Sequence, residues 1–158
     1  MNLTVLASMP LQVRMINMVS ITVEVDTSAL TEKLSADKLE QAKEQGMNYA
    51  TQEMVRVLMQ NSPVDHGLLK SWFIDTFSSE EASIKSPAEY ARYVNDGTGP
   101  YTITPNSAKA LYWEGASHPV KVVHHPGIKG QHFVENSIND VSGRLDGYFL
   151  RAISEVLG

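Results

Sequence analysis

The first clear element of the chain is an alternation of apolar and polar residues. Residues 20–26 place the apolar side chains Ile21, Val23 and Val25 between polar neighbours. Successive side chains of a strand point to opposite faces, so this alternation predicts a half-buried strand. The next residues, 27–34, begin with Thr27 and a serine that can cap a short helical turn.

A long helix is expected over residues 35–60. Its apolar and small residues recur every three or four positions, which places them on one stripe facing the core. Gly46 is unfavourable inside a helix by roughly 1 kcal/mol against alanine, which indicates close packing or a bend. Pro63 disfavours the helical conformation of the residue before it and ends the helix. The stripe is Leu39, Ala42, Gly46, Ala50, Met54, Val57 and Leu58.

The middle of the chain predicts a hairpin and a short helix. Residues 69–77 have apolar side chains on both faces, which favours a central strand, and residues 82–85 form its return partner. Residues 87–94 then predict a short helix, because Pro87 suits a first helical turn.

Glycines and prolines mark residues 95–106 as a loop. Residues 110–113 and 120–124 predict a second hairpin. A last helix is expected over residues 131–157, weakened locally by two glycines. Its stripe is Val134, Ile138, Val141, Leu145, Tyr148, Phe149, Ala152, Ile153 and Val156.

This order of elements predicts an α+β fold, with an antiparallel sheet of about four to five strands packed by two long helices. One short helix and a projecting loop complete it. Residues 20–158 are expected to form a single domain, since 158 residues fit one domain better than two. Residues 1–19 are expected to be a loosely ordered N-terminal extension, with no signal peptide or membrane span.

Charge and cysteine content narrow the possible functions. The formal charge is −5 and no cluster of Lys and Arg occurs, so stable DNA binding by the monomer is not expected. Cysteine is absent, which excludes disulfides, thiol catalysis and thiolate metal sites.

Histidines are the main candidates for chemistry. His118 and His124 could meet across the second hairpin and bind a metal ion with Asp65, as in a metal-dependent hydrolase. His124 and His125 are adjacent in a strand and should point to opposite faces. The Asp65–Gly67 sequence after a proline is typical of a turn. We therefore favour ordinary hydrogen-bonded histidines and expect no cofactor, metal or catalytic residue.

Aromatic residues gather in sequence around the 95–106 loop. They could be anchors of a subunit interface, or equally part of the core, because tyrosine is intermediate in burial. The residues considered for an interface are Arg92, Tyr93, Tyr101, Tyr112 and Trp113, with Tyr90 beside them.

Several signatures follow one another in a specific order. A long helix is followed by Ser62-Pro63-Val64-Asp65-His66-Gly67-Leu68-Leu69-Lys70, then Tyr90-Ala91-Arg92-Tyr93-Val94-Asn95-Asp96-Gly97-Thr98-Gly99-Pro100, then Pro105 with Lys109-Ala110-Leu111. His125-Pro126-Gly127-Ile128-Lys129-Gly130 and Phe133-Val134 come last. This order resembles the gene-product-ten-like minor virion proteins of long-tailed bacteriophages. The motif residues are Pro63, Asp65, Gly67, Leu69, Tyr90, Val94, Gly97, Thr98, Pro105, His125, Pro126, Gly127 and Phe133.

The resemblance implies a structural virion protein at the head-tail joint, as a neck, tail-completion or tail-terminator subunit. Such a protein would form a homo-oligomeric ring, contact the connector and tail-tube proteins, and let DNA pass without sequence-specific binding. The alternatives are a metal-dependent hydrolase and a prophage-encoded, non-catalytic interaction module.

Overall fold

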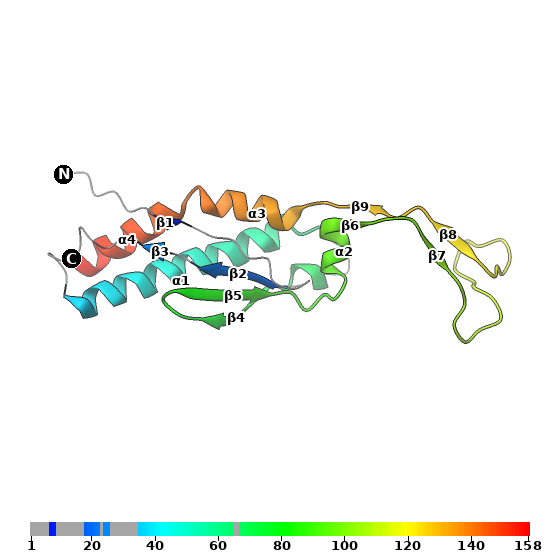
Figure 1. Ribbon diagram of the computed structural model, residues 1–158, viewed down its shortest axis with the longest axis horizontal. Helices are drawn as coiled ribbons and strands as arrows, with labels where there is room; N and C mark the ends of the chain where they lie inside the picture. Colours follow the sequence, from blue (N-terminus) through cyan, green and yellow to red (C-terminus); the bar gives the residue numbers. More distant parts are fainter. Residues whose placement is uncertain (1–6, 9–17, 23, 26–34, 65–66) are drawn as a thin grey trace. The chain divides into compact units, whose positions relative to one another are not determined.

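The computed structural model describes residues 7–8, 18–22, 24–25, 35–64 and 67–158, which form helices and short antiparallel strands (Figure 1). The α+β class is therefore confirmed. The helical turn expected over 27–34, and most of the N-terminal extension, lie outside the described residues. No helix in the described part of the chain is long and apolar enough to cross a membrane.

The chain divides into two compact units, which are described separately. Met1–Ala91 and Phe133–Gly158 form one, here named the main unit, and Arg92–His132 form the other, here named the ladder segment. The expectation of a single domain over residues 20–158 stays a prediction.

The long helix α1, Ala36–Asn61, is the centre of the main unit and matches the predicted helix closely. Ser35 caps it by accepting a hydrogen bond from the Lys38 N–H. Close packing at Gly46 is confirmed, because a Cβ atom there would overlap the ring of Phe149. Six residues of the predicted stripe are buried in α1, namely Ala42, Gly46, Ala50, Met54, Val57 and Leu58, whereas Leu39 is only partly buried. Met47 and Thr51, which the pattern did not predict, are buried as well.

Two helices, α3 (Phe133–Ser142) and α4 (Leu145–Leu157), follow α1 (Figure 1). The single helix predicted over 131–157 is therefore interrupted. At the break, the Arg144 N–H donates to the Val141 carbonyl three residues earlier, and Arg144 has φ −118° and ψ 0°. The helical spacing of the stripe is kept on both sides, with Ile138 and Val141 buried before the break and Leu145 and Phe149 after it.

The main sheet of the described residues has three antiparallel strands in the order β2 (Met18–Thr22), β5 (Glu81–Lys85) and β4 (Phe73–Phe77). The single strand predicted over residues 20–26 is divided, because β2 ends at Thr22 and residues 24–25 belong to another strand, while residue 23 lies outside the described residues. In β2, Ile21 is buried as the alternation predicts, and so is Val19 before the predicted range. A short pair, β1 (Ala7–Ser8) with β3 (Glu24–Val25), also belongs to this unit.

The central strand was predicted wrongly. The hairpin of β4 and β5 is confirmed, but β5 lies in the middle of the sheet and β4 at its edge. The apolar residues at the start of the predicted strand belong instead to a 3₁₀ turn, η1 (Leu68–Lys70), which buries Leu69. The apolar residues over 69–77 suggested a strand buried on both faces because the range includes two elements, the 3₁₀ turn η1 and the edge strand β4.

The ladder segment contains more strand than expected. The helix predicted over 87–94 lies later, as α2 (Ala91–Asp96). The expected loop contains β6 (Gly97–Thr98) and β7 (Tyr101–Ile103).

Two later strands pair with them, since β6 pairs with β9 (Ile128–Lys129) and β7 with β8 (Val123–His125). The second hairpin is reduced to one bridge, Leu111 to Val120. The return strand predicted over residues 120–124 thus pairs mainly with β7, through β8. The strands of the described residues form one three-stranded sheet and two-stranded ladders, instead of one sheet of four to five strands.

Candidate functional site

The first family motif forms the corner that follows α1. The Ser62 hydroxyl donates to the Leu58 carbonyl at 2.6 Å and accepts from Nε1 of Trp72 at 2.9 Å. Gly67 has φ +79°, a backbone conformation that glycine adopts without strain and other residues rarely adopt. Pro63 is partly buried before it, while the role predicted for Asp65 lies outside the described residues.

Residues far apart in the sequence pack together after this corner, one of them the motif residue Phe133. Trp72 is buried and its ring packs edge-on against Phe133, with centroids 6.4 Å apart and an interplanar angle of 66°. Leu69 is also buried. The Trp72–Phe133 contact joins the segment after the corner to the start of α3, and Leu69 and Phe133 are core residues that are not exposed for binding.

The other motifs meet in the ladder segment. The Thr98 hydroxyl accepts from the Ile128 N–H at 3.2 Å, and the Val94 carbonyl accepts from the Gln131 N–H at 3.0 Å. The second and last motifs, far apart in sequence, therefore form one antiparallel ladder.

Two glycines of this ladder have close backbone neighbours. Gly97 has φ +80°, and a Cβ there would lie 2.6 Å from the Ile128 carbonyl oxygen. Gly127 has φ +89°, and its Cβ would lie 2.7 Å from the Gly99 carbonyl oxygen. Any side chain at either position would have to displace backbone atoms.

His125 closes the turn of the last motif. Its Nδ1 atom accepts from the Gly127 N–H at 3.0 Å. Because an N–H can only donate, this bond needs an unprotonated Nδ1 and places the proton of the neutral ring on Nε2. The ring also stacks on Tyr101, with centroids 4.8 Å apart. His125 therefore has a structural role in the ladder, beside Pro126, which is exposed.

The remaining candidate histidines are bonded to hydroxyl groups. His124 Nδ1 lies 3.2 Å from Oγ1 of Thr102, and His118 Nδ1 lies 2.9 Å from Oγ of Ser117. Among the described residues, which leave out Asp65 and His66, no three His, Asp or Glu side chains are grouped to hold a metal ion.

Exposure favours the surface alternative for the aromatic residues. Tyr112 is 68% exposed, Tyr93 54% and Trp113 50%. Tyr101 is 47% exposed beside His125, whereas Tyr90 and Pro105 are partly buried. Arg92 is exposed and pairs with Asp96 at 3.5 Å. The ladder segment therefore presents large apolar side chains to solvent.

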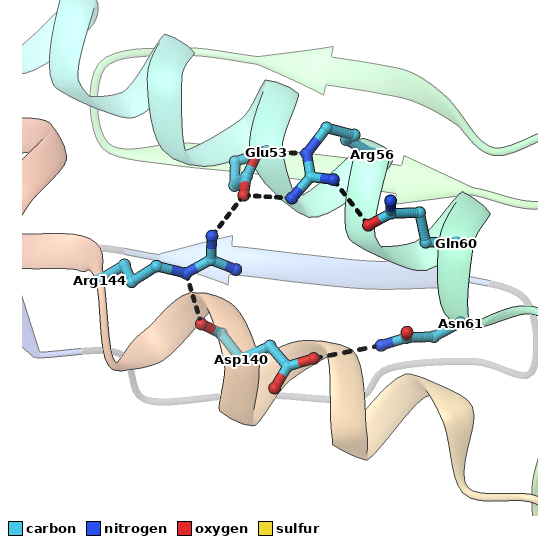
Figure 2. Close-up of polar contacts among 6 residues, drawn as sticks. All are labelled: Glu53, Arg56, Gln60, Asn61, Asp140 and Arg144. Atoms are coloured by element: carbon cyan, nitrogen blue, oxygen red, sulfur yellow. Dashed lines mark hydrogen bonds and ion pairs between the residues drawn. The ribbon is translucent and has the colours of Figure 1, made fainter.

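A polar network on the main unit links α1 to α3 and to the break before α4 (Figure 2). Glu53 accepts two hydrogen bonds of 2.6 Å from Arg56, and a third of 2.6 Å from Arg144. The Arg144 Nε–H also donates to the Asp140 carbonyl at 2.9 Å. Asn61 donates to Oδ2 of Asp140 at 3.3 Å. These bonds fix the end of α3 against α1.

The arginines shift the ionisation of this network. The hydrogen bond from Arg56 is the largest cause that holds the pKa of Glu53 below its ordinary value, and Arg144 adds to it. Beside it, burial raises the pKa of the Tyr148 hydroxyl. This hydroxyl is buried and has no hydrogen-bond partner among the described residues.

The sequence pattern did not reveal this network. The three-residue spacing of Glu53 and Arg56 on a helix could have predicted their pair, since such residues are neighbours on the helix surface. Arg144 is 91 residues from Glu53 in sequence, and no local pattern joins them. The groups are paired with one another, as expected for a structural contact.

Comparison with known proteins agrees with this structural role. Residues 27–97 match the HK97-gp10-like family model, described as "Bacteriophage HK97-gp10, putative tail-component". The matched range includes α1, the corner after it and the β4–β5 hairpin. No curated protein and no solved structure matches the chain significantly. The family match confirms the resemblance of this chain to the gene-product-ten-like tail components of bacteriophages.

Proposed function

We propose that the protein is a non-enzymatic structural component of a bacteriophage virion. It acts at the head-tail joint as a neck, tail-completion or tail-terminator subunit, after assembly in the host cytoplasm. Copies of the chain form a homo-oligomeric ring that contacts the connector and tail-tube proteins. The observation that carries the proposal is the match of residues 27–97 to a family of phage tail components.

The geometry of the motif residues supports a structural role. Trp72, two residues after the first motif, joins Ser62 and Phe133 of the motifs in a buried corner, and Thr98, His125 and Gly127 hold the ladder. Each polar group in these contacts has a partner that stabilises backbone or packing. The motifs thus preserve the shape of the protein.

Charge supports the passage of DNA through the ring. The chain has 13 basic and 18 acidic residues, so a ring of copies is acidic overall. A lumen lined by acidic or neutral side chains lets phosphates slide, whereas a basic lining would retain them.

A phage with a stop codon in this gene tests the proposal. We expect lysates of this phage to contain DNA-filled heads without attached tails, and electron microscopy to show them separately from free tails. The wild-type gene supplied from a plasmid should restore attached tails and infectivity. Normal, infectious, tailed particles from the stop-codon phage would contradict the proposal.

A further inference from the structure

The β7–β8 ribbon of the ladder segment has two different faces. Tyr101 pairs with His125 and Ile103 pairs with Val123, so these four side chains lie on one face. Between them, Thr102 pairs with His124 on the other face. One face of the ribbon is therefore apolar and aromatic, and the other is polar.

Nothing within the ladder segment fully covers the apolar face. The structure describes every residue of Arg92–His132, and no hydrophobic side chain in that range is buried. Two-stranded ribbons are only marginally stable alone in water, and they gain stability when another layer covers their apolar face. This face thus has the properties of an interface.

The apolar face of the ribbon could be covered by the ladder segment or by the main unit of a second copy, and the two differ in net charge. The ladder segment has two acidic and four basic residues, giving a formal charge of +2. The main unit holds the other nine basic and 16 acidic residues, giving −7. Contact between two ladder segments would bring like charges together, whereas contact with a main unit brings opposite charges together. The basic residues are Arg92, Lys109, Lys121 and Lys129.

Three of these basic residues are available for such a contact. No carboxylate lies within ion-pair distance of Lys109, Lys121 or Lys129 in the part of the chain that the structure describes. On the main unit, Glu81 at the start of β5 is exposed and likewise has no cation partner among the described residues. Unpaired charges of opposite sign therefore lie on the two surfaces.

Of the two edge strands of the main sheet, β2 and β4, β4 is the one that carries exposed large hydrophobic side chains. Among the described residues it pairs with β5 alone and lies at the edge of the sheet (Figure 1). Phe73 and Phe77 on this strand are 46% and 40% exposed. Glu80, which pairs with Lys43 at 4.0 Å, lies in the turn that follows, and Glu81 begins β5. Exposed aromatic side chains beside acidic groups complement the apolar face of the ribbon and the net positive charge of the ladder segment.

We infer that the apolar face of the β7–β8 ribbon in one copy docks on the β4 edge of a second copy. The inference rests on the proposed ring assembly and names the surfaces that build it. Because the two surfaces differ, the contact is heterologous, and repeated contacts of this kind close a ring when the rotation between copies divides a full turn.

Cross-linking between isotopically distinct copies tests this contact. The photoreactive residue p-benzoylphenylalanine replaces Tyr101 in unlabelled protein, which is mixed at about millimolar concentration with ¹⁵N-labelled wild-type protein and irradiated. Trypsin cuts after Lys70 and Lys85, so residues 71–85 form one peptide that contains β4 and β5. We expect the ¹⁵N form of this peptide to be the main cross-linked product.

Leu157 provides a matched control position. It is 50% exposed, close to the 47% of Tyr101, but lies at the end of α4. The same photoreactive residue at Leu157 should not label the ¹⁵N peptide of residues 71–85. Replacing Phe73→Ser in the ¹⁵N protein should lower the yield from position 101 several-fold, with an unchanged circular dichroism spectrum because Phe73 is exposed.

Other products would overturn the inference. Cross-links from position 101 to the ladder segment of the ¹⁵N copy, to the same copy only, or to no ¹⁵N peptide would each exclude the β4 contact. So would a double variant, Lys121→Glu with Lys129→Glu, whose inter-copy yield from position 101 equals that of the unaltered ladder segment. None of these results would alter the phenotype of the stop-codon phage, so they separate this inference from the proposed function.

Discussion

Gly46→Ala is expected to destabilise the protein, although helix propensity alone favours the substitution. Alanine is better than glycine inside a helix by roughly 1 kcal/mol. At this position, however, the new methyl group would overlap the ring of Phe149 on α4, with the Cε1 atom 2.7 Å away. Overpacking of a well-packed core typically costs about 1–3 kcal/mol. The net result is a loss of up to about 2 kcal/mol.

Gly147→Ala is the matched control, because Gly147 lies in α4 and a Cβ there would meet nothing within 4 Å. Only the propensity gain remains, so we expect a stabilisation of up to about 1 kcal/mol. Urea unfolding followed by circular dichroism gives both values. For a chain of this size, 1 kcal/mol shifts Tm by roughly 2–4 °C, so the two variants should shift Tm in opposite directions.

A second variant tests the cause of the loss. Phe149→Leu removes the ring that the new methyl group meets, so Gly46→Ala should cost less in the Phe149→Leu background than in the wild type. If Gly46→Ala stabilises the wild-type protein as much as Gly147→Ala does, α1 and α4 do not approach closely at Gly46, and the reasoning is refuted.

Three further predictions concern the corner, the polar network and the ladder. Trp72→Phe removes the donor to Ser62 and should lower the free energy of unfolding by about 1 kcal/mol in urea, whereas an unchanged value would show that the bond contributes nothing. The pKa of Glu53 is lowered in the folded state, so its contribution is present above the ordinary glutamate pKa of about 4.3 and is lost as pH falls through the folded pKa. Glu53→Gln should therefore lower the free energy of unfolding at pH 7, and this free energy should then decrease less steeply as the pH is lowered. An equally steep decrease in the variant would show that other carboxylates cause the loss of stability in acid. His125→Ala should accelerate hydrogen exchange of the Gly127 amide while thermal unfolding of the main unit is unchanged, and slow exchange there would show that the turn does not need the imidazole.

The long helices could be predicted because their sequence pattern is local. Residues of α1 repeat at helical spacing and Ser35 marks the start, so its bounds were predicted to within about one residue. The small residue Gly46 also indicated close packing, although the partner Phe149 is far away in sequence.

Strand pairing was harder to predict because the partners of a strand are not local. The bridge between Leu111 and Val120 was expected as a full hairpin, but Val123–His125 pairs instead with Tyr101–Ile103. A run of apolar residues at 69–77 suited a central strand, yet the edge position of β4 depends on where β2 and β5 lie. Register and order arise from long-range contacts that a single sequence pattern does not contain.

At the candidate site, too, local features could be predicted from the sequence and long-range contacts could not. Exposed aromatics near residue 100 could be identified as an interface or as core, and only burial in the folded structure separates the two. Contacts such as Glu53 with Arg144 join elements that fold together from distant segments. Such pairs cannot be read from spacing along one helix.

Mass spectrometry of gradient-purified virions measures most directly whether the protein is a structural part of the phage particle. Particles of the encoding phage are purified from free lysate protein, and peptides of this chain are quantified against those of the major tail protein. We expect several copies per particle, retained after washing in high salt. A chain that is abundant in the lysate but absent from infectious particles would contradict a structural role in the virion.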